Sequence, residues 1–238
     1  MPAKTVLLVH GAWHGAWCYA ALQAELDRRG IPSLAVDLPG HGVSPLPLGD
    51  LYGDAQHVAD TLSRIDGPVV LVGHSYGGAV ITEAASRHSA NVDHLVYLTA
   101  FALEEGEALM PYLQSLPPVE VPLGAAIRPN AEGTASTVDP AHTEVAFYGE
   151  CPTGTTEASN ARLCPQPFAT FMQPVTGSPR KKIASTYIEC TLDGAIAYEH
   201  QRIMSARCNE VFTLETDHSP FASRPVETAD ILERLARA

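Results

Sequence analysis

Six short runs of β-branched and aliphatic residues recur along the chain, with few polar residues inside each run. Continuous apolar runs are typical of parallel strands that helices cover on both faces, whereas half-exposed strands alternate apolar with polar residues. The sequence therefore predicts a mostly parallel sheet of about six strands, at residues 4–9, 33–36, 69–72, 94–98, 183–188 and 211–214.

Segments with the helical spacing of apolar residues separate these runs. The predicted helices lie at residues 17–29, 51–65, 78–88, 198–204 and 226–236. Alternation of strand and helix indicates a doubly wound α/β sheet with helices on both faces. In such a sheet, active sites lie at the carboxyl ends of the strands.

Residues 103–179 interrupt this alternation, because they carry 11 of the 19 prolines and only short helical patterns. A long irregular insertion in a compact domain is usually either a functional lid or a disordered excursion. The aromatic residues Phe168 and Phe171, together with Met172, favour an ordered segment. We therefore expect one domain over residues 1–238, with residues 103–179 as an inserted cap.

Composition and charge narrow the class of partner. Fifteen Lys and Arg residues against 27 Asp and Glu residues give a net charge of −12, which repels nucleic acid and anionic lipid. No apolar run approaches the ~20 residues of a membrane-spanning helix, and no secretory signal pattern opens the sequence. We expect a cytoplasmic protein with neither nucleic-acid nor membrane partners. Five cysteines without CxxC spacing suit free thiols.

The sharpest chemical signal is Gly73-His74-Ser75-Tyr76-Gly77, which stands between a predicted strand and a predicted helix. In that context a G-x-S-x-G pattern predicts a nucleophile elbow. The glycines avoid clashes in a tight turn, and the serine hydroxyl is exposed at the strand end. Ser75 is therefore the predicted nucleophile.

A serine hydroxyl needs a base near neutral pH, and histidine is the usual one. Of the ten histidines, His218 is best placed, because it follows the last predicted strand and reaches the sheet edge that carries Ser75. His74 adjoins the nucleophile but should point elsewhere. His57 and His88 lie on predicted helices and are expected to be solvated.

The base in turn needs a carboxylate that fixes its tautomer and stabilises the imidazolium. Asp193 follows the fifth predicted strand and gives the chain order Ser, Asp, His. Glu104 or Glu105, after the fourth strand, is the alternative acid. Asp217 is adjacent to the base in sequence and can hardly reach across its ring.

Acyl transfer also requires donors for the developing oxyanion, commonly backbone N–H groups. Tyr76 follows the nucleophile, and Ala12 lies in the glycine-rich loop after the first strand; Trp13 is the alternative donor. His10 and His14 lie in the same loop, but no third residue has convincing spacing for a metal site. We expect neither a metal nor a cofactor.

Several aromatic and small residues near these motifs are candidates for an apolar substrate pocket, although aromatic residues at such positions are equally often plain core. The pocket candidates are Gly11, Trp13, Phe101, Phe168, Phe171 and Met172, and Trp17 and Tyr76 are further candidates.

Taken together, the motifs resemble the α/β-hydrolase superfamily, in the branch of plant hydroxynitrile lyases, methyl-ester hydrolases and bacterial esterases. The motifs that carry the resemblance are His10-Gly11-Ala12-Trp13-His14-Gly15-Ala16-Trp17, Asp37-Leu38-Pro39-Gly40-His41-Gly42, Gly73-His74-Ser75-Tyr76-Gly77-Gly78, Thr191-Leu192-Asp193 and Asp217-His218-Ser219-Pro220-Phe221. The resemblance implies a triad of Ser75, Asp193 and His218, an oxyanion hole from the Ala12 and Tyr76 backbones, and a cap. Homodimers are frequent in this branch, so a homodimer is a further expectation.

Two departures bear on the activity. Lyases of this branch carry a threonine where Gly11 stands and a lysine where Ser219 stands. Their absence favours hydrolysis of a small carboxylic ester through an acyl-enzyme. A cofactor-free lyase is the alternative enzyme, and a non-catalytic small-molecule receptor on the same scaffold is the alternative binding module.

Overall fold

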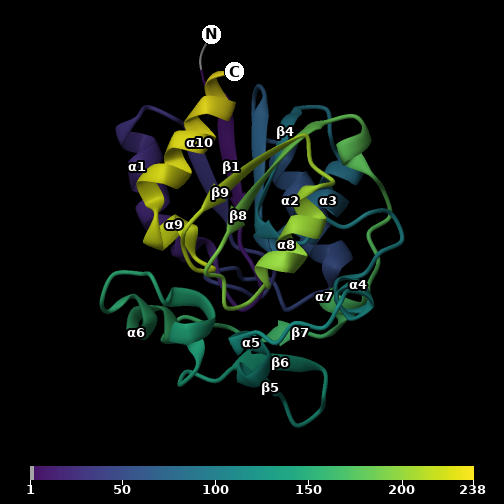
Figure 1. Ribbon diagram of the computed structural model, residues 1–238. Helices are drawn as coiled ribbons and strands as arrows, with labels where there is room; N and C mark the ends of the chain where they lie inside the picture. Colours follow the sequence, from purple (N-terminus) through teal and green to yellow (C-terminus); the bar gives the residue numbers. More distant parts are fainter. Residues whose placement is uncertain (1–2) are drawn as a thin grey trace.

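A six-stranded parallel sheet forms the centre of the computed structural model, which describes residues 3–238 (Figure 1). Its strands run in the order β2-β1-β3-β4-β8-β9, and every neighbouring pair is parallel. The strands are β1 (Thr5–Val9), β2 (Ser33–Val36), β3 (Val69–Ser75), β4 (Val92–Ala100), β8 (Ala184–Cys190) and β9 (Glu210–Leu214). The predicted fold class and the six predicted strands are confirmed.

Helices cover both faces of this sheet. One face carries α2 (Leu51–Leu62) and α3 (Gly77–Arg87), and α8 (Tyr198–Ser205) packs beside them against β8. The other carries α1 (Ala20–Arg28) and α10 (Pro225–Arg237). Short turns precede the last two, at η1 (Ala16–Tyr19) and α9 (Pro220–Ser223). The start of the predicted helix at residues 17–29 is therefore a 3₁₀ turn. Among the helices of residues 3–238, none combines the length and apolar character needed to cross a bilayer.

Successive residues of the central strands enter two separate cores, which explains why their apolar runs are continuous. Leu7 and Leu71 pack with α2 and α3, whereas their neighbours Val6 and Val70 pack with α1 and α10. Side chains of a strand alternate between faces, so a strand buried on both faces needs an apolar residue at every position.

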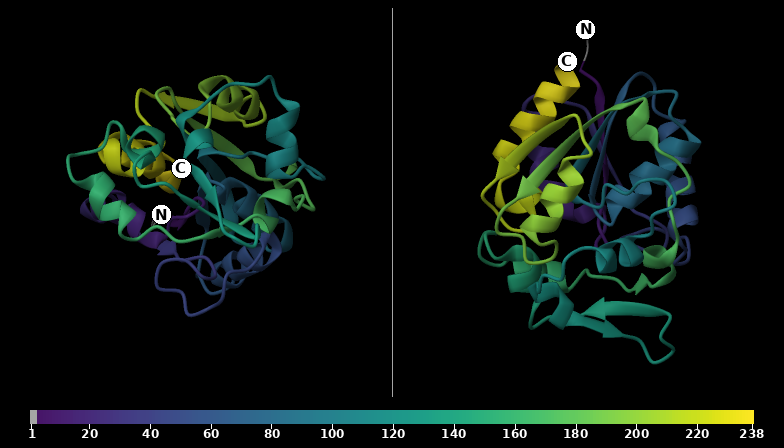
Figure 2. Two further views of the ribbon diagram at one scale, coloured as in Figure 1. Left: turned by 90° about the horizontal axis from the view of Figure 1, so that it is seen from below. Right: turned by 45° about the vertical axis from the view of Figure 1, so that its right-hand side comes forward.

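Residues 103–179, called the insert below, leave the sheet after β4 and cover its carboxyl edge, at the opposite end from both termini (Figures 1 and 2). The insert contains an antiparallel sheet in the order β5-β6-β7, which the sequence did not predict. Its elements are α4 (Leu109–Ser115), α5 (Pro122–Ala126), β5 (Ile127–Pro129), β6 (Ala135–Val138), the π-helical turn η2 (Glu144–Tyr148), α6 (Thr155–Asn160), β7 (Gln166–Pro167) and α7 (Ala169–Met172). A 3₁₀ turn, η3 (Pro179–Lys181), leads back to β8.

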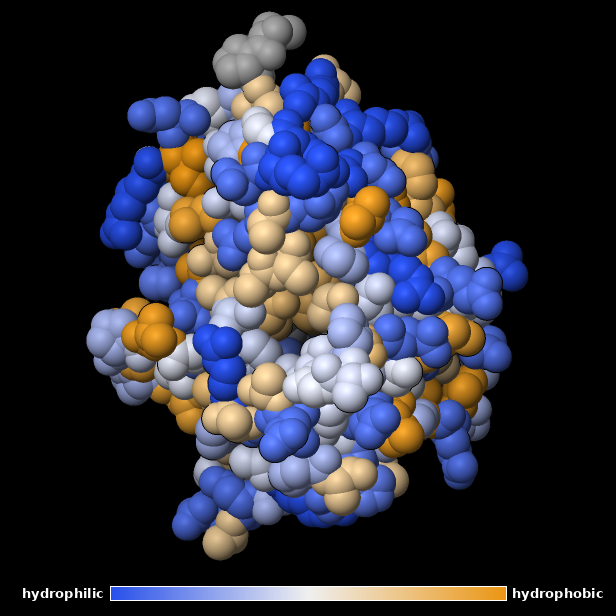
Figure 3. Space-filling view, turned by 90° about the vertical axis from the view of Figure 1, so that its left-hand side faces the viewer, coloured by the Kyte–Doolittle hydropathy of each residue, from blue (hydrophilic) through white to orange (hydrophobic). Residues whose placement is uncertain are grey.

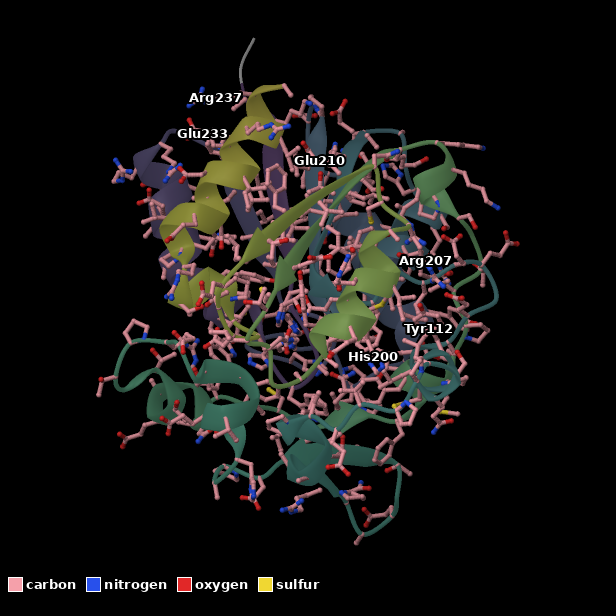
Figure 4. The ribbon with its side chains drawn as sticks, viewed as in Figure 1. Tyr112, His200, Arg207, Glu210, Glu233 and Arg237 are labelled. Atoms are coloured by element: carbon pink, nitrogen blue, oxygen red, sulfur yellow. The ribbon has the colours of Figure 1, made fainter. Side chains whose placement is uncertain are left out.

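Charged and polar side chains tie the first part of the insert to α8 and the residues after it (Figure 4). Arg207 donates two hydrogen bonds to Glu107, at 2.6 and 3.0 Å, and its guanidinium lies 4.6 Å from the ring centre of Tyr112. His200 Nε2 donates to the carbonyl of Pro117 across 2.7 Å. The insert is thus fastened to the sheet domain near the point where it begins.

Candidate active site

The Gly73 to Gly77 motif forms a sharp turn from β3 into α3. Ser75 has a left-handed backbone, with φ 53°, which is uncommon for a residue other than glycine. A Cβ atom at Gly73 would lie 2.4 Å from the Gly77 carbonyl oxygen, and one at Gly77 would lie 2.6 Å from the Val9 carbonyl oxygen. Only glycine fits at these two positions, so the local sequence dictates the turn that presents Ser75.

Asp193 and His218 form a buried hydrogen-bonded pair. Nδ1 of His218 lies 2.7 Å from Oδ2 of Asp193, and the side chains are 2% and 0% exposed. The other carboxylate oxygen of Asp193 accepts the backbone N–H groups of Ala195 and Ile196, at 2.7 and 2.8 Å. Because Asp193 accepts from Nδ1, that nitrogen carries the proton and the Nε2 of His218 is left as an acceptor.

Two further side chains hold the Asp193 carboxylate. The Thr99 hydroxyl donates to Oδ2, and Gln201 Nε2 donates to the same oxygen across 3.3 Å. Thr99 is buried and has a positive φ of 36°, so its backbone is strained at the end of β4. No sequence motif identifies Thr99 or Gln201, because only the fold brings these residues next to Asp193.

His218 lies beside the nucleophile turn. His74 Nε2 donates to the backbone carbonyl of His218 across 2.8 Å, and the two ring centres are 4.6 Å apart. Within residues 3–238, no hydrogen bond joins Ser75 Oγ to His218, and Nε2 of His218 is not used in any other bond. Catalytic hydrogen bonds are often long without substrate and shorten in the complex.

The alternative acids are occupied elsewhere. Glu104 pairs with Arg180 at 2.6 Å, and Glu105 is exposed. Asp217 turns away from the neighbouring imidazole and accepts the backbone N–H of Glu150, in the insert, across 2.8 Å. The arrangement around His218 therefore contains Asp193 and neither Glu104 nor Glu105.

Two backbone donors near Ser75 are unused, one in the loop after β1 and one in the turn that follows Ser75. The Trp13 N–H donates to Gln166 Oε1 across 3.2 Å, so it is engaged. Within the described chain, the N–H groups of Ala12 and Tyr76 form no hydrogen bond. Of the two sequence alternatives in this loop, Ala12 has the available donor and Trp13 does not.

An apolar cavity of about 410 Å³ opens over Ser75. Trp13, Phe101, Phe168 and Phe171, all pocket candidates, line it, as do Tyr76 and further aliphatic residues of the insert. Charged side chains are absent from the part of its wall that residues 3–238 form. The other wall residues from the insert include Leu109, Met110, Leu113, Leu123 and Ile127.

Three pocket candidates do not line this cavity. Met172 is 57% exposed, and the prediction for it is wrong because adjacent residues of the short helix α7 point in different directions and Phe171 takes the inward one. Gly11 packs directly against the nucleophile turn, since a Cβ atom at this position would lie 2.8 Å from the Ser75 Cβ. Trp17 instead lines a second hollow of about 300 Å³, on the face between the sheet domain and the insert (Figure 3).

Buried histidines surround the site in neutral form. Burial lowers the pKa of His14 to about 4 and those of His10 and His74 well below the usual range. His10 Nε2 accepts the Leu38 N–H, and both nitrogens of His14 face hydrogen-bond partners. These rings are committed to structural hydrogen bonds and do not present a pair of free metal ligands.

Asp54 is a buried carboxyl group that sequence reasoning missed. It accepts the Tyr76 hydroxyl across 2.7 Å, while its other oxygen has no partner among the described residues. Burial, with a smaller contribution from the nearby Asp50, raises the pKa of Asp54 to about 7. An aspartate in the first turn of a helix is ordinarily a surface residue, so no sequence signal marked it.

A family model described as "Alpha/beta hydrolase family" matches residues 6–231. A carbendazim hydrolyzing esterase from Nocardioides sp. is 42% identical over 119 residues, which span 48% of this chain and 49% of that protein. A pFDCC methylesterase from Arabidopsis thaliana is 28% identical over 94% of this chain and 91% of its own. The crystal structure of a pyrethroid hydrolase from Sphingobium faniae has a TM-score of 0.85 and 28% identity, and the match covers 99% of this chain and 98% of that one.

Proposed function

Because the chain belongs to the alpha/beta hydrolase family, we propose that it is a serine esterase for small, uncharged carboxylic esters. The observation that carries the proposal is the buried Asp193–His218 pair beside the Ser75 turn, under an apolar cavity. The named relatives described above include an esterase, a methylesterase and a hydrolase, which supports the same reaction class.

The first half of the reaction forms an acyl-enzyme. Ser75 Oγ attacks the ester carbonyl carbon while His218 Nε2 takes the hydroxyl proton, and Asp193 stabilises the resulting imidazolium. The carbonyl oxygen becomes an oxyanion, which accepts the N–H groups of Ala12 and Tyr76. The C–O bond to the alcohol then breaks, and the alcohol leaves with the proton from His218.

The second half releases the acid. A water molecule gives a proton to His218 Nε2 and attacks the acyl carbon, and the new oxyanion uses the same two N–H groups. Collapse of this intermediate returns the proton to Ser75 Oγ and frees the carboxylic acid. Throughout, the proton moves only between His218 and the reacting oxygens, so Asp193 remains a carboxylate.

The lining of the cavity supports a neutral substrate. A charged acyl or alcohol group would lose its hydration against the aromatic and aliphatic wall without gaining a partner. In the proposed function the insert is a cap, because Leu109, Phe168 and Phe171 from the insert line the same cavity as Ser75. Removal of water around the reacting carbonyl strengthens the hydrogen bonds to the oxyanion.

Hydrolysis of p-nitrophenyl acetate and butyrate, with labelling by a fluorophosphonate, tests the proposal. Ser75→Ala should lose the label and about 10⁴-fold or more of kcat. Ser63→Ala, at the exposed end of α2, is the matched control and should behave as wild type. Ester turnover or labelling that survives in Ser75→Ala would contradict the assignment. Cyanohydrin cleavage by wild type without ester turnover would favour a lyase, and tight ligand binding without labelling would favour a receptor.

A further inference from the structure

Trp13 adopts a strained backbone next to the proposed oxyanion donor Ala12. Its φ is 63°, in the left-handed region that bulky residues rarely enter. A strained residue of this kind persists only where its surroundings hold it by several contacts. The contacts that hold Trp13 therefore determine the shape of the loop that presents Ala12.

The insert supplies the hydrogen bonds to the polar groups of Trp13. Gln166 Oε1 accepts its backbone N–H at 3.2 Å, and the Cys164 N–H donates to its carbonyl at 2.8 Å. The indole N–H donates to the Ser136 carbonyl at 3.1 Å. Three residues of the insert thus hold Trp13, which lies in the loop after β1 and directly follows Ala12.

Gln166 is fixed so that its oxygen faces two donors, the Trp13 N–H and Nε2 of His41, the latter at 3.0 Å. The side chain is fully buried, and its Nε2 donates to the Thr170 hydroxyl across 2.9 Å. That hydroxyl in turn donates to the Pro167 carbonyl, so the amide cannot turn over without losing bonds. Gln166 on β7 also lies directly opposite Ser136 on the antiparallel strand β6. The acceptors of the Trp13 backbone N–H and of its indole N–H therefore stand side by side in one short sheet.

We propose that Gln166 is a positioning residue for the oxyanion hole. By accepting the Trp13 N–H, it holds the loop in the strained form that leaves the Ala12 N–H free to face the substrate carbonyl. This inference rests on the proposed esterase function. Since the oxyanion develops only on the way to the transition state, loss of this contact lowers kcat and changes KM little.

Gln166→Leu removes the acceptor at similar volume, and Gln166→Glu retains an acceptor oxygen. The matched control is Gln173→Leu, because Gln173 also joins the insert to a backbone N–H of the sheet domain, that of Leu51 at 2.9 Å, away from the oxyanion loop. For p-nitrophenyl butyrate we expect kcat of Gln166→Leu to fall by at least about 10-fold, with KM within about 3-fold of wild type. Gln166→Glu should recover most of kcat, and Gln173→Leu should keep it.

A trifluoromethyl ketone, which forms a tetrahedral oxyanion adduct with the serine, provides the second readout. Its Ki for Gln166→Leu should rise by the same factor as kcat falls, whereas loss of packing alone would lower the melting temperature without this matched rise. If Gln166→Leu does not fold, Gln166→Asn withdraws the oxygen by one methylene and should show the same fall in kcat.

Equal kcat for the Leu variants at 166 and 173, or a loss confined to KM, would overturn the positioning role. Failure of the proposed function is separate, because wild type itself would then show neither ester turnover nor fluorophosphonate labelling.

Discussion

His74 and His218 are linked by a hydrogen bond of 2.8 Å, from the imidazole N–H of the first to the backbone carbonyl of the second. His74 directly precedes Ser75 in the turn between β3 and α3. The turn that presents the proposed nucleophile therefore also holds the backbone of the proposed base, although 144 residues separate the two histidines in sequence.

Replacing His74 should weaken both folding and catalysis. His74→Phe keeps a ring but leaves the buried His218 carbonyl without its donor, which costs about 1–3 kcal/mol of unfolding free energy. The base is then less well placed, so kcat should fall as well. Urea unfolding and ester hydrolysis measure the two effects. His57→Phe, on α2, is the control, and equal behaviour of the two variants would contradict this role.

The Thr99 hydroxyl should contribute to activity through Asp193. Thr99→Val has nearly the same shape but removes a hydrogen bond to a carboxylate, which is worth about 1.5–3 kcal/mol. We expect kcat to fall by about 10-fold as the Asp193–His218 pair loosens. Thr99→Ser restores the hydroxyl and should restore kcat. A Val variant with wild-type kcat would show that Ala195, Ile196 and Gln201 hold the carboxylate without Thr99.

Gly11 should not tolerate a side chain. A Cβ atom there would lie 2.8 Å from the Ser75 Cβ and 2.9 Å from His74 Nδ1, so Gly11→Ala must displace the nucleophile turn. Ester hydrolysis should fall by at least about 100-fold, and Gly11→Thr should gain no cyanohydrin cleavage, because the threonine position of the lyases is blocked by His74. Gly49→Ala, where the nearest atoms lie 3.8 Å or more from the added carbon, is the control.

The stability of the protein should depend on the protonation of Asp54. Burial raises its pKa to about 7, above the ordinary 3.8 of the unfolded chain. Below pH 4 both states hold the proton; between pH 4 and 7 only the folded state holds it, so the free energy of unfolding falls as pH rises. Above pH 7 Asp54 is ionised in both the folded and the unfolded state, so the free energy of unfolding no longer changes with pH on its account.

Asp54→Asn keeps an acceptor for Tyr76 and removes this dependence. The free energy of unfolding of this variant should therefore gain on that of wild type from pH 4 to 7, and the difference should level off above pH 7 at roughly 4 kcal/mol. Urea unfolding at pH 4, 5.5, 7 and 8.5 measures it. Asp60→Asn, exposed on the same helix, should follow wild type at every pH. A constant difference between Asp54→Asn and wild type would contradict the burial argument.

The sheet could be predicted from the sequence because each strand is buried on both faces and carries its own apolar run. Ser75, Asp193 and His218 could be chosen for a related reason, since each follows or ends a parallel strand and such ends meet at one edge. Gln166 could not be chosen in this way. It lies on a two-residue strand in a proline-rich segment, and its role depends on pairing with Ser136, which no local pattern records.

The sequence also could not predict which side chains of the insert are buried. Phe171 and Met172 are neighbours of similar hydropathy, and only the docking of α7 decides that the first faces the cavity and the second faces solvent. Asp54 is the opposite case: aspartate is ordinarily exposed, but this one is buried because the Tyr76 hydroxyl, from another element, donates a hydrogen bond to it.

Because the insert forms hydrogen bonds to Trp13, the insert and the loop after β1 must be exchanged together when this protein is engineered. A chimaera that combines this sheet with the insert of a relative would lose the partners of Trp13 at Ser136, Cys164 and Gln166, along with the native cavity wall. Exchange of substrate range between homologues should therefore succeed when residues 11–15 are transplanted together with residues 103–179, and not when the insert is grafted alone.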